Sequence, residues 1–211
     1  MAALLVRRLA VGPKVFSFRQ GVKVHPKAVA GIKRDSLIVG SFILFHVGSR
    51  YLGESFHLAE SGPDGWQPFA TALSTLWAGM SASAIVAMQH VFFWGALGSI
   101  LLFMPYFLYS KHIHIFFAPL NYLLKPKRKS IGELEKINFD DESLSQFGAS
   151  RLEHLSQSQL MDAYSCIMCN RCQDACPAYQ TGKVLSPSAL EINKRYWLNE
   201  HGAEFAAGKE S

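Results

Sequence analysis

The sequence predicts an all-α protein in which membrane helices precede a smaller helical domain, and three observations support this fold class. Residues 37–57 and 82–109 are long apolar runs, and the second contains no Lys, Arg, Asp or Glu. Basic residues are concentrated before the first run and after the second. All four cysteines lie further along, within residues 166–176. Because about 20 mostly apolar residues can cross a bilayer as a helix, both runs are predicted to span a membrane.

The distribution of charge predicts the orientation of these two spans. Residues 1–35 carry eight Lys or Arg and one acid, and five Lys or Arg follow the second span within residues 111–129. The connecting loop, residues 58–81, contains acids but no Lys or Arg. Positive residues are retained on the cytoplasmic side of a membrane. We therefore expect a multi-pass protein of the cytoplasmic (inner) membrane, with both termini inside and the loop outside. A mitochondrial presequence is the alternative for the basic stretch, although a presequence needs no span directly behind it.

The cysteines follow the pattern C-x2-C-x2-C-x3-C, and Pro177 comes directly after the last of them. Steps of three residues allow one short turn to present sulfurs to neighbouring corners of a cubane cluster. The proline then directs the chain away from that turn and removes a backbone donor. This spacing is that of the ligand run of a bacterial [4Fe–4S] cluster. The predicted cluster and metal ligands are Cys166, Cys169, Cys172 and Cys176.

Two other uses of the cysteines are less compatible with this spacing. Structural zinc sites usually have two separated pairs of ligands and not one run of four. Disulfides are poorly suited to a reducing cytosol. In two-cluster ferredoxins the fourth cysteine of such a run ligates the other cluster. It therefore stays open whether Cys176 ligates the same cluster as the other three cysteines or a cluster completed by another chain.

Further helices are expected outside the spans. A short helix at the membrane surface is predicted within residues 69–80, and an amphipathic helix over residues 144–164 leads to the cysteines. The pair Ser186-Pro187 is a good N-cap and first-turn pair for a last helix, which Gly202 is expected to end. The resulting domains are a basic N-terminal segment (1–35), a membrane domain (36–123), a linker (124–143) and a [4Fe–4S] ferredoxin-like domain (144–211).

Several histidines lie in or next to the predicted spans. An imidazole inside the hydrocarbon is costly and usually has a function, and haem takes one axial ligand from each of its faces. His57 and His90 both lie about 30 Å from the inner ends of their helices, at 1.5 Å per residue. We therefore predict that this pair holds one haem b near the outer side.

His46 lies about 14 Å from the inner end of its helix, which makes it the candidate for a second haem. Its expected partner is His112 or His114, in the corner that follows the second span. This pairing requires the second helix to be shortened, for example by a kink at Pro105. For each of these histidines the alternative is an ordinary polar residue at the membrane interface.

Two segments near these histidines resemble a known family. Residues 44–48 read LFHVG, and residues 110–114 read SKHIH, followed by PLNYL at 119–123. These segments resemble the gamma-subunit family of respiratory nitrate reductase, in which the histidine of FHVG and the last histidine before the proline are axial ligands of haem b. The resemblance implies that His46 and His114 are such ligands.

The cysteine segment resembles a second group of proteins. Residues 165–177, with TGKVLSP at residues 181–187, look like membrane-bound iron–sulfur oxidoreductases related to heterodisulfide reductase and to electron-transfer-flavoprotein:menaquinone oxidoreductase. The gamma-type fold has five spans, whereas two are predicted here. The second group also carries another cysteine quartet and cysteine-rich catalytic domains. We therefore expect either a truncated or split gene product, or a reduced subunit that partners complete.

These features together predict a membrane-anchored electron-transfer subunit. It would pass electrons between a cytoplasmic donor, the [4Fe–4S] cluster, haem b and (mena)quinone. The expected partners are membrane lipid, quinone, and a cysteine-rich catalytic subunit or an electron-transfer flavoprotein. No side chain stands out as a catalytic acid or base. A nucleic-acid binder would rest only on the basic N-terminus, whose charges are explained by the predicted membrane topology, so no nucleic-acid partner is expected.

Two other functions remain open from the sequence. The first is a cluster-binding membrane anchor without haem, which docks a catalytic partner. The second is a zinc-stabilised membrane adaptor without redox activity.

Overall fold

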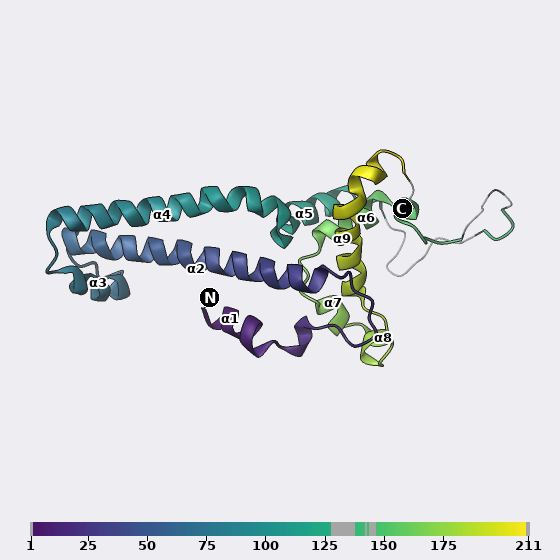
Figure 1. Cartoon of the computed structure of the whole chain (residues 1–211), viewed down its shortest axis with the longest axis horizontal. Coiled ribbons are helices and arrows are strands. Elements are labelled where there is room, and N and C mark those ends of the chain that lie inside the picture. The colour runs from purple at the N-terminus through teal and green to yellow at the C-terminus, as the bar shows by residue number, and fades with distance from the viewer. Residues whose placement is uncertain (1, 128–137, 142, 144–146, 210–211) are drawn as a thin grey trace. The chain divides into compact units, whose positions relative to one another are not determined.

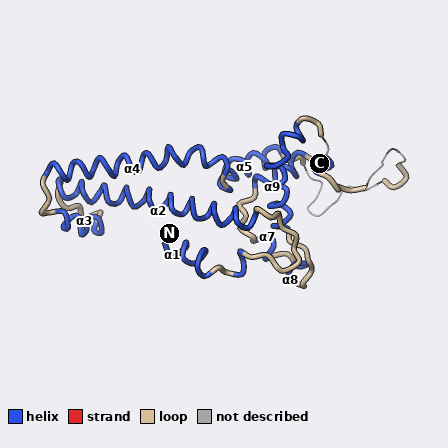
Figure 2. Tube along the Cα trace, viewed as in Figure 1, coloured by secondary structure: helices blue, strands red, loops and turns tan. Residues whose placement is uncertain are grey.

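The structure, a computed structural model, describes residues 2–127, 138–141, 143 and 147–209, and all regular secondary structure among them is helical (Figure 2). The chain forms two compact units. The first comprises Met1–Pro13 and Lys33–Ser110, and the second comprises Lys14–Ile32 and Lys111–Ser211. The all-α prediction is confirmed for the described residues.

Two long helices dominate the first unit (Figure 1). Helix α2 covers Ala28–Ser61, with its first residues in the second unit, and α4 covers Ala82–Tyr109. Helix α4 has the predicted bounds and continues through Pro105. Among the described residues it is the single helix long and apolar enough, by length and composition, to cross a membrane. The other predicted span lies inside α2, which also carries several charged residues, and its membrane assignment stays a prediction.

The side chains that join α2 to α4 recur in steps of three and four residues on both helices. Phe42 stacks on Phe103 with ring centroids 4.1 Å apart, and a Cβ at Gly53 would lie 3.3 Å from the Cβ of Phe92. Such spacing is typical of helices that pack side by side at a small crossing angle. We call this contact the seam. Its residues are Phe42, His46, Ser49, Gly53, Phe56 and Glu60 on α2, and Gln89, Phe92, Gly95, Ala96, Ser99 and Phe103 on α4.

The connection between the two long helices is folded against α2. It contains α3 (Pro68–Ser74) and the 3-10 helix η3 (Thr75–Trp77), so the predicted helix within residues 69–80 is shorter than expected. The indole N–H of Trp77 donates to the hydroxyl of Ser55 at 3.0 Å, and its ring stacks on Phe56 at 4.5 Å. This contact secures the connection because it satisfies a polar atom while it buries an aromatic ring.

The N-terminal residues of the first unit form the short helix α1 (Ala2–Val6) and the π-helix η1 (Arg7–Val11). Leu5 lies directly over Gly40 of α2, because a Cβ at Gly40 would overlap the methyl groups of Leu5. The buried carboxylate of Asp35 accepts a hydrogen bond of 2.9 Å from the hydroxyl of Tyr106. Burial lowers the pKa of Arg8 from its ordinary value, and the nearby negative charge of Asp35 counteracts that shift.

The second unit combines the start of α2 with several shorter helices. Its core contains Ala28, Met168 and Ile192, against which Cys166 and Tyr196 pack. The helices are η2 (Lys14–Phe16), η4 (Lys111–Ile113), α5 (His114–Leu124), η5 (Leu152–His154), α6 (Gln157–Ser165), α7 (Arg171–Asp174), α8 (Pro177–Gln180) and α9 (Pro187–Ala206). Within the described part of the predicted linker, α5 ends at Leu124, and residues 128–137 and 142 lie outside the described residues.

Two predicted helix boundaries in this unit are wrong. Helix α6 begins at Gln157 and not near residue 144, because Ser156 caps it in a capping box with Gln159. Residues 144–146 of that predicted helix lie outside the described residues. Helix α9 starts after the predicted cap, Ser186, but continues past Gly202 to Ala206. A glycine inside a helix costs about 1 kcal/mol relative to alanine, which the rest of α9 tolerates.

Candidate functional site

The four cysteines lie on one compact stretch of the second unit that links three short helices. Cys166 follows the last residue of α6, Cys172 lies in α7, and Cys176 is the N-cap of α8. Between Cys166 and Cys172 the backbone turns twice through the left-handed region, at Met168 (φ 59°) and at Asn170 (φ 61°). Such values are uncommon for residues other than glycine, so this loop is closely folded.

Backbone N–H groups are directed at the sulfur atoms of this loop. The N–H of Met168 donates to the Sγ of Cys166 at 3.3 Å. Burial raises the pKa of the Cys166 thiol, this N–H lowers it, and the charges of the neighbouring thiols raise it further. At Cys172 burial also raises the thiol pKa, and the N–H of Gln173 counteracts this. The sulfurs are thus close enough to influence each other, and the loop supplies N–H groups that stabilise thiolate charge.

Four thiols, two of which have N–H groups directed at them, fit the chemistry of an iron–sulfur cluster, whose ligands are thiolates stabilised by hydrogen bonds to sulfur. In residues 2–127 and the described parts of 138–209, no group of three or more His, Cys, Asp or Glu side chains is placed to hold a metal ion. The assignment of Cys166, Cys169, Cys172 and Cys176 as cluster ligands stays a prediction.

The cysteine loop has a buried side and an exposed side. Met168 is 5% exposed and belongs to the core of the unit, and Cys166 packs against that core. Cys172 is exposed. The half-buried carboxylate of Glu191 on α9 is close enough to raise the pKa of both thiols. Burial raises the pKa of Glu191 itself, and its ion pair of 2.8 Å with Lys194 lowers it.

The imidazole of His46 lies in the seam and has a defined orientation. Its Nδ1 is 3.1 Å from the carbonyl oxygen of Ala96 and 3.2 Å from the hydroxyl of Ser99. Because a carbonyl oxygen only accepts, Nδ1 carries the proton in this contact. The lone pair of Nε2 then remains available, which is the arrangement usual for metal-ligating histidines.

His57 and His90 are placed differently from His46. Each lies one residue beyond a seam position, next to Phe56 and Gln89 respectively, and both side chains are exposed. One residue along a helix is a rotation of about 100°. In two antiparallel helices, the residues that directly follow the contact positions therefore project to the same side of the pair, and His57 and His90 are such residues. Among the described residues, the imidazoles of His57 and His90 have no hydrogen-bond partner. The structure also shows no ring contact between these two imidazoles in that part of the chain.

The remaining two candidates, His112 and His114, are close to each other in the second unit. Their ring centroids are 6.3 Å apart, and both side chains are half-buried. Nδ1 of His114 is 3.1 Å from the carbonyl oxygen of Lys111 and therefore donates to it. As at His46, this leaves the Nε2 lone pair available.

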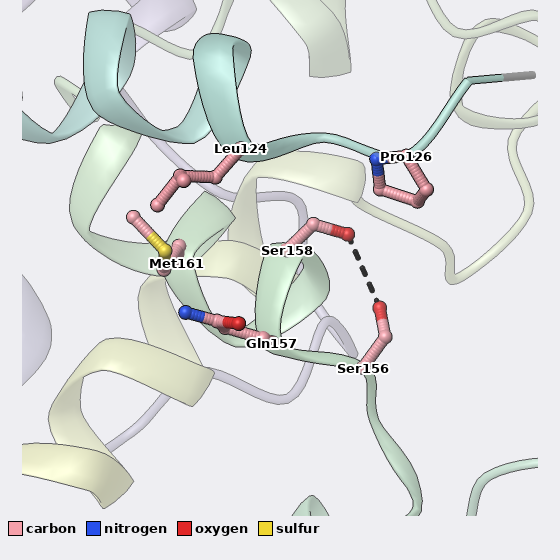
Figure 3. Close-up of a pocket in the computed structure, with 6 residues that line it drawn as sticks. All are labelled: Leu124, Pro126, Ser156, Gln157, Ser158 and Met161. Atoms are coloured by element: carbon pink, nitrogen blue, oxygen red, sulfur yellow. Dashed lines mark hydrogen bonds between the residues drawn. The ribbon is translucent and has the colours of Figure 1, made fainter.

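A hollow of about 190 Å³ lies elsewhere in the second unit, where the end of α5 meets the start of α6 (Figure 3). Apolar Leu124 and Met161 face serine residues across it, and the hydroxyls of Ser156 and Ser158 are 3.2 Å apart. None of its lining residues is a cysteine or a histidine, so this hollow is separate from the candidate sites. The lining residues are Leu124, Pro126, Ser156, Gln157, Ser158 and Met161.

Comparison with known proteins finds similarity to iron–sulfur and quinone-linked oxidoreductases. The chain is 36% identical over 154 residues to the probable iron-sulfur-binding oxidoreductase FadF of Bacillus subtilis, covering 72% of this chain and 22% of that protein. It is 30% identical over 145 residues to the EtfAB:quinone oxidoreductase of Syntrophomonas wolfei, covering 68% of this chain and 20% of that protein. The chain thus matches about a fifth of the length of each relative. No family model and no solved structure matches it.

The sequence analysis did not select three residues that surround the cysteine loop. Asn170 and Gln173 have buried side chains within the cysteine run, and Glu191 lies on α9. A signal for Asn170 existed, because asparagine tolerates the left-handed region better than most residues. No signal for Gln173 or Glu191 existed, because their role depends on segments distant in sequence.

Proposed function

We propose that this chain is the membrane-anchored electron-transfer part of a quinone-linked iron–sulfur oxidoreductase. The observation that carries the proposal is the cysteine run Cys166–Cys176, with backbone N–H groups directed at the sulfurs of Cys166 and Cys172. The similarity to an iron-sulfur-binding oxidoreductase over most of the chain supports it. The four cysteines would hold a [4Fe–4S] cluster, which supplies a one-electron relay when bound.

The chain's own residues would shield one side of this site and open the other. Cys166 and Met168 lie against the core, so water is excluded there. Cys172 is exposed and would face a soluble electron donor. The N–H groups of Met168 and Gln173 favour the charged thiolate form of Cys166 and Cys172. Because these groups belong to the folded backbone, they are already oriented toward the sulfurs.

Haem b is the second cofactor of the proposal. His46 and His114 are the best supported ligands, because each donates from Nδ1 to a backbone carbonyl and keeps Nε2 available. His112 is the alternative to His114. His57 and His90 are exposed on one side of the helix pair, so a haem held by them would need cover from lipid or from another protein.

The membrane part of the proposal rests on α4, with the segment 37–57 of α2 as a second span. The Lys and Arg residues lie before the first helix and after the second, and none lies in the loop between them. This distribution would keep the cysteine site in the cytoplasm. The similarity to an EtfAB:quinone oxidoreductase supports an electron-transfer flavoprotein as donor and quinone as acceptor. Catalytic domains would then be supplied by further sequence or by a partner.

A second candidate function is a cluster-binding anchor without haem that docks a catalytic partner. The exposure of His57 and His90 favours it, since the structure shows no contact between these imidazoles in the described residues. Optical spectra of the reduced protein distinguish the two functions, because a b-type α band is expected only if haem is bound.

The full chain, purified anaerobically in detergent, tests the proposal. We expect about four iron and four acid-labile sulfide per chain from one cubane cluster, with additional iron as haem b. A Cys169→Ser variant should lose the cubane EPR signal and keep the haem spectrum. Colourless protein that contains zinc and no sulfide would replace the proposal with the zinc-stabilised adaptor.

A further inference from the structure

We propose that residues 14–27, here called the strap, form part of the cysteine site, and that Asn170 and Gln173 are positioning residues that hold the cysteine loop between the strap and α9. This inference rests on the proposed function. The strap is separated from the cysteines by about 150 residues of sequence, but both belong to the second unit, in which the strap runs near α7 and α8 (Figure 1).

Asn170 makes the first connection. Its side-chain Nδ2 donates to the carbonyl oxygen of Val15 in the strap at 3.1 Å. Its Oδ1 accepts from the hydroxyl of Ser188 in the first turn of α9. The side-chain amide of Asn170 thus joins the strap to α9. Asn170 lies two residues before Cys172, and its backbone is in the left-handed region.

Gln173 makes a parallel connection on the other side of Cys172. Its Nε2 donates to the carbonyl oxygen of Ser17 at 3.2 Å, and its Oε1 accepts from the hydroxyl of Ser186. The same hydroxyl accepts from the backbone N–H of Ala189 at 3.0 Å and so caps α9. Cys172 is therefore flanked by two amides with the same arrangement of partners.

A third amide holds the far end of the strap. Asn193 of α9 donates from Nδ2 to the carbonyl oxygen of Lys23 at 2.9 Å and accepts from the backbone N–H of His25 at 2.8 Å. The strap then continues into α2 at Ala28, which is fully buried in the core beside Met168. Both ends of the strap are thus fixed to the structure that carries the cysteines.

The chemistry explains why these side chains are amides. Each must donate to a strap carbonyl and accept from a hydroxyl or an N–H at once, and a carboxylate cannot donate. Asn170 and Gln173 are 4% and 3% exposed, and their partners Ser188 and Ser186 are 1% and 5% exposed, so all four residues are almost completely buried. A buried polar group that loses its partner is strongly disfavoured, so an isosteric acid at either position should release the strap.

The consequence for the site is specific. With the strap released, the loop segment between Cys169 and Cys172 loses the contacts that fix its left-handed turn at Asn170. The sulfur positions and the N–H groups directed at them should then become less ordered. We expect faster loss of iron and a changed reduction potential, and not simply lower overall stability.

The test compares Asn170→Asp and Gln173→Glu in the full-length protein with Gln180→Glu. The side chain of Gln180 is exposed and donates to the carbonyl of Asp174 and not to the strap, so its variant controls for the added charge. An Asn170→Gly variant removes the amide without adding charge and still permits a positive φ. The measurements are the rate at which a ferrous chelator removes iron anaerobically, the midpoint potential by EPR titration, and hydrogen exchange of the strap amides.

We expect Asn170→Asp, Asn170→Gly and Gln173→Glu to lose iron at least about tenfold faster than the wild type, with Gln180→Glu within about twofold. Each acid variant loses one buried hydrogen bond, and Asn170→Gly loses both side-chain hydrogen bonds of Asn170. Wild-type rates, potentials and strap exchange in all three would overturn the inference. An Asn170→Gly variant that behaves as wild type would show that the backbone conformation alone matters, which also overturns it.

Failure of the proposed function gives a different result. If the wild-type chain binds no cluster, iron and sulfide are absent from every variant, including the Gln180→Glu control. Hydrogen exchange still decides the structural part of the inference in that case. Faster exchange of residues 14–27 in Asn170→Asp than in Gln180→Glu is then expected, and equal exchange would refute the connection.

Discussion

At the scale of single residues, the side chains that matter here are those whose hydrogen bonds fix an orientation. The imidazole of His46 is oriented by its Nδ1 contacts with Ala96 and Ser99, which leave Nε2 as the nitrogen for a ligand. The same reasoning applies to His114 and Lys111. Orientation of this kind separates these two histidines from His57 and His90, whose imidazoles have no described partner.

The first prediction at this scale concerns His46. Replacing His46 with alanine should remove at least one haem per chain and leave the EPR signal of the cluster unchanged, because the cysteine loop is in the other unit. The amplitude of the reduced α band measures the loss. Ser99→Ala is the matched control, since it removes one Nδ1 partner and keeps the imidazole and its contact with Ala96. Unaltered haem content in His46→Ala would reject the ligand role.

The second prediction concerns pH and the attachment of the strap to α9. The ammonium of Lys27 and the imidazole of His25 bond to the carboxylate of Glu200 at 2.5 Å and 3.1 Å. These contacts hold the pKa of Glu200 below its ordinary value. A lowered folded-state pKa stabilises the fold above the unfolded-state pKa, and this stabilisation is lost as pH falls through the folded-state value.

Glu200→Gln should therefore destabilise the protein near neutral pH, and the difference from wild type should shrink as pH falls below about 4.5, the usual carboxyl range. Thermal unfolding followed by circular dichroism across this range measures it. Glu204→Gln is the control, because Glu204 pairs with His201 on the same helix and does not touch the strap. A difference that stays constant with pH would contradict this account.

At the scale of elements, the two long helices of the first unit are joined by a regular seam. Small residues permit close approach at two of its positions: Gly53 faces Phe92, and Gly95 faces Ser49. Aromatic pairs fill the seam on either side of these positions, as Phe42 and Phe103 do toward one end and Phe56 and Phe92 toward the other. The two helices therefore have complementary shapes along their contact. Such close packing is what holds helices together in lipid, where the burial of apolar side chains gives no hydrophobic driving force.

The third prediction tests this seam. Gly53→Leu should weaken the α2–α4 contact by about 1–3 kcal/mol, because its Cβ already lies 3.3 Å from the Cβ of Phe92. Gly98→Leu on α4 is the matched control, since no atom lies within 4 Å of a Cβ there. Thermal unfolding in detergent, followed by circular dichroism at about 222 nm, measures the effect. Equal midpoints for the two variants would show that Gly53 is not at a close contact.

Element by element, the sequence was a good guide where a pattern is local and a poor one where partners are distant. Helix α4 has its predicted bounds because its apolar run and the cap at Ser81 are both local. Helix α6 starts later than predicted, because the capping box at Ser156 outweighs the weaker periodicity before it. Helix α9 runs past Gly202, because its other residues sustain the helix and no left-handed turn forms there.

The candidate site shows the same division. The cysteine spacing is visible in the sequence because all the donors lie within eleven residues. The amides of Asn170 and Gln173 were not predicted, since their partners Val15 and Ser17 are about 155 residues away. The seam position of His46 and the exposure of His57 likewise depend on which faces of α2 and α4 meet.

At the scale of the whole molecule, the two units divide the proposed work. The first contains the long helices and the second contains the cysteines, and α2 belongs to both because its first turn lies in the core of the second unit. The strap is continuous with α2, so the segment that closes the cysteine site also leads into the proposed first span.

The last prediction concerns the orientation of the whole chain in a membrane. The loop at residues 58–81 has no Lys or Arg, whereas residues 1–35 have eight, so the loop should be outside and both ends inside. Alkaline phosphatase fused after Gly65, which folds only outside the cytoplasm, should be active, and a fluorescent protein fused to the C-terminus should fluoresce. Replacing the basic residues of η1 and the strap with glutamine should weaken this preference. An inactive phosphatase with the unmodified N-terminus would contradict this orientation, because the loop at residues 58–81 would then lie in the cytoplasm.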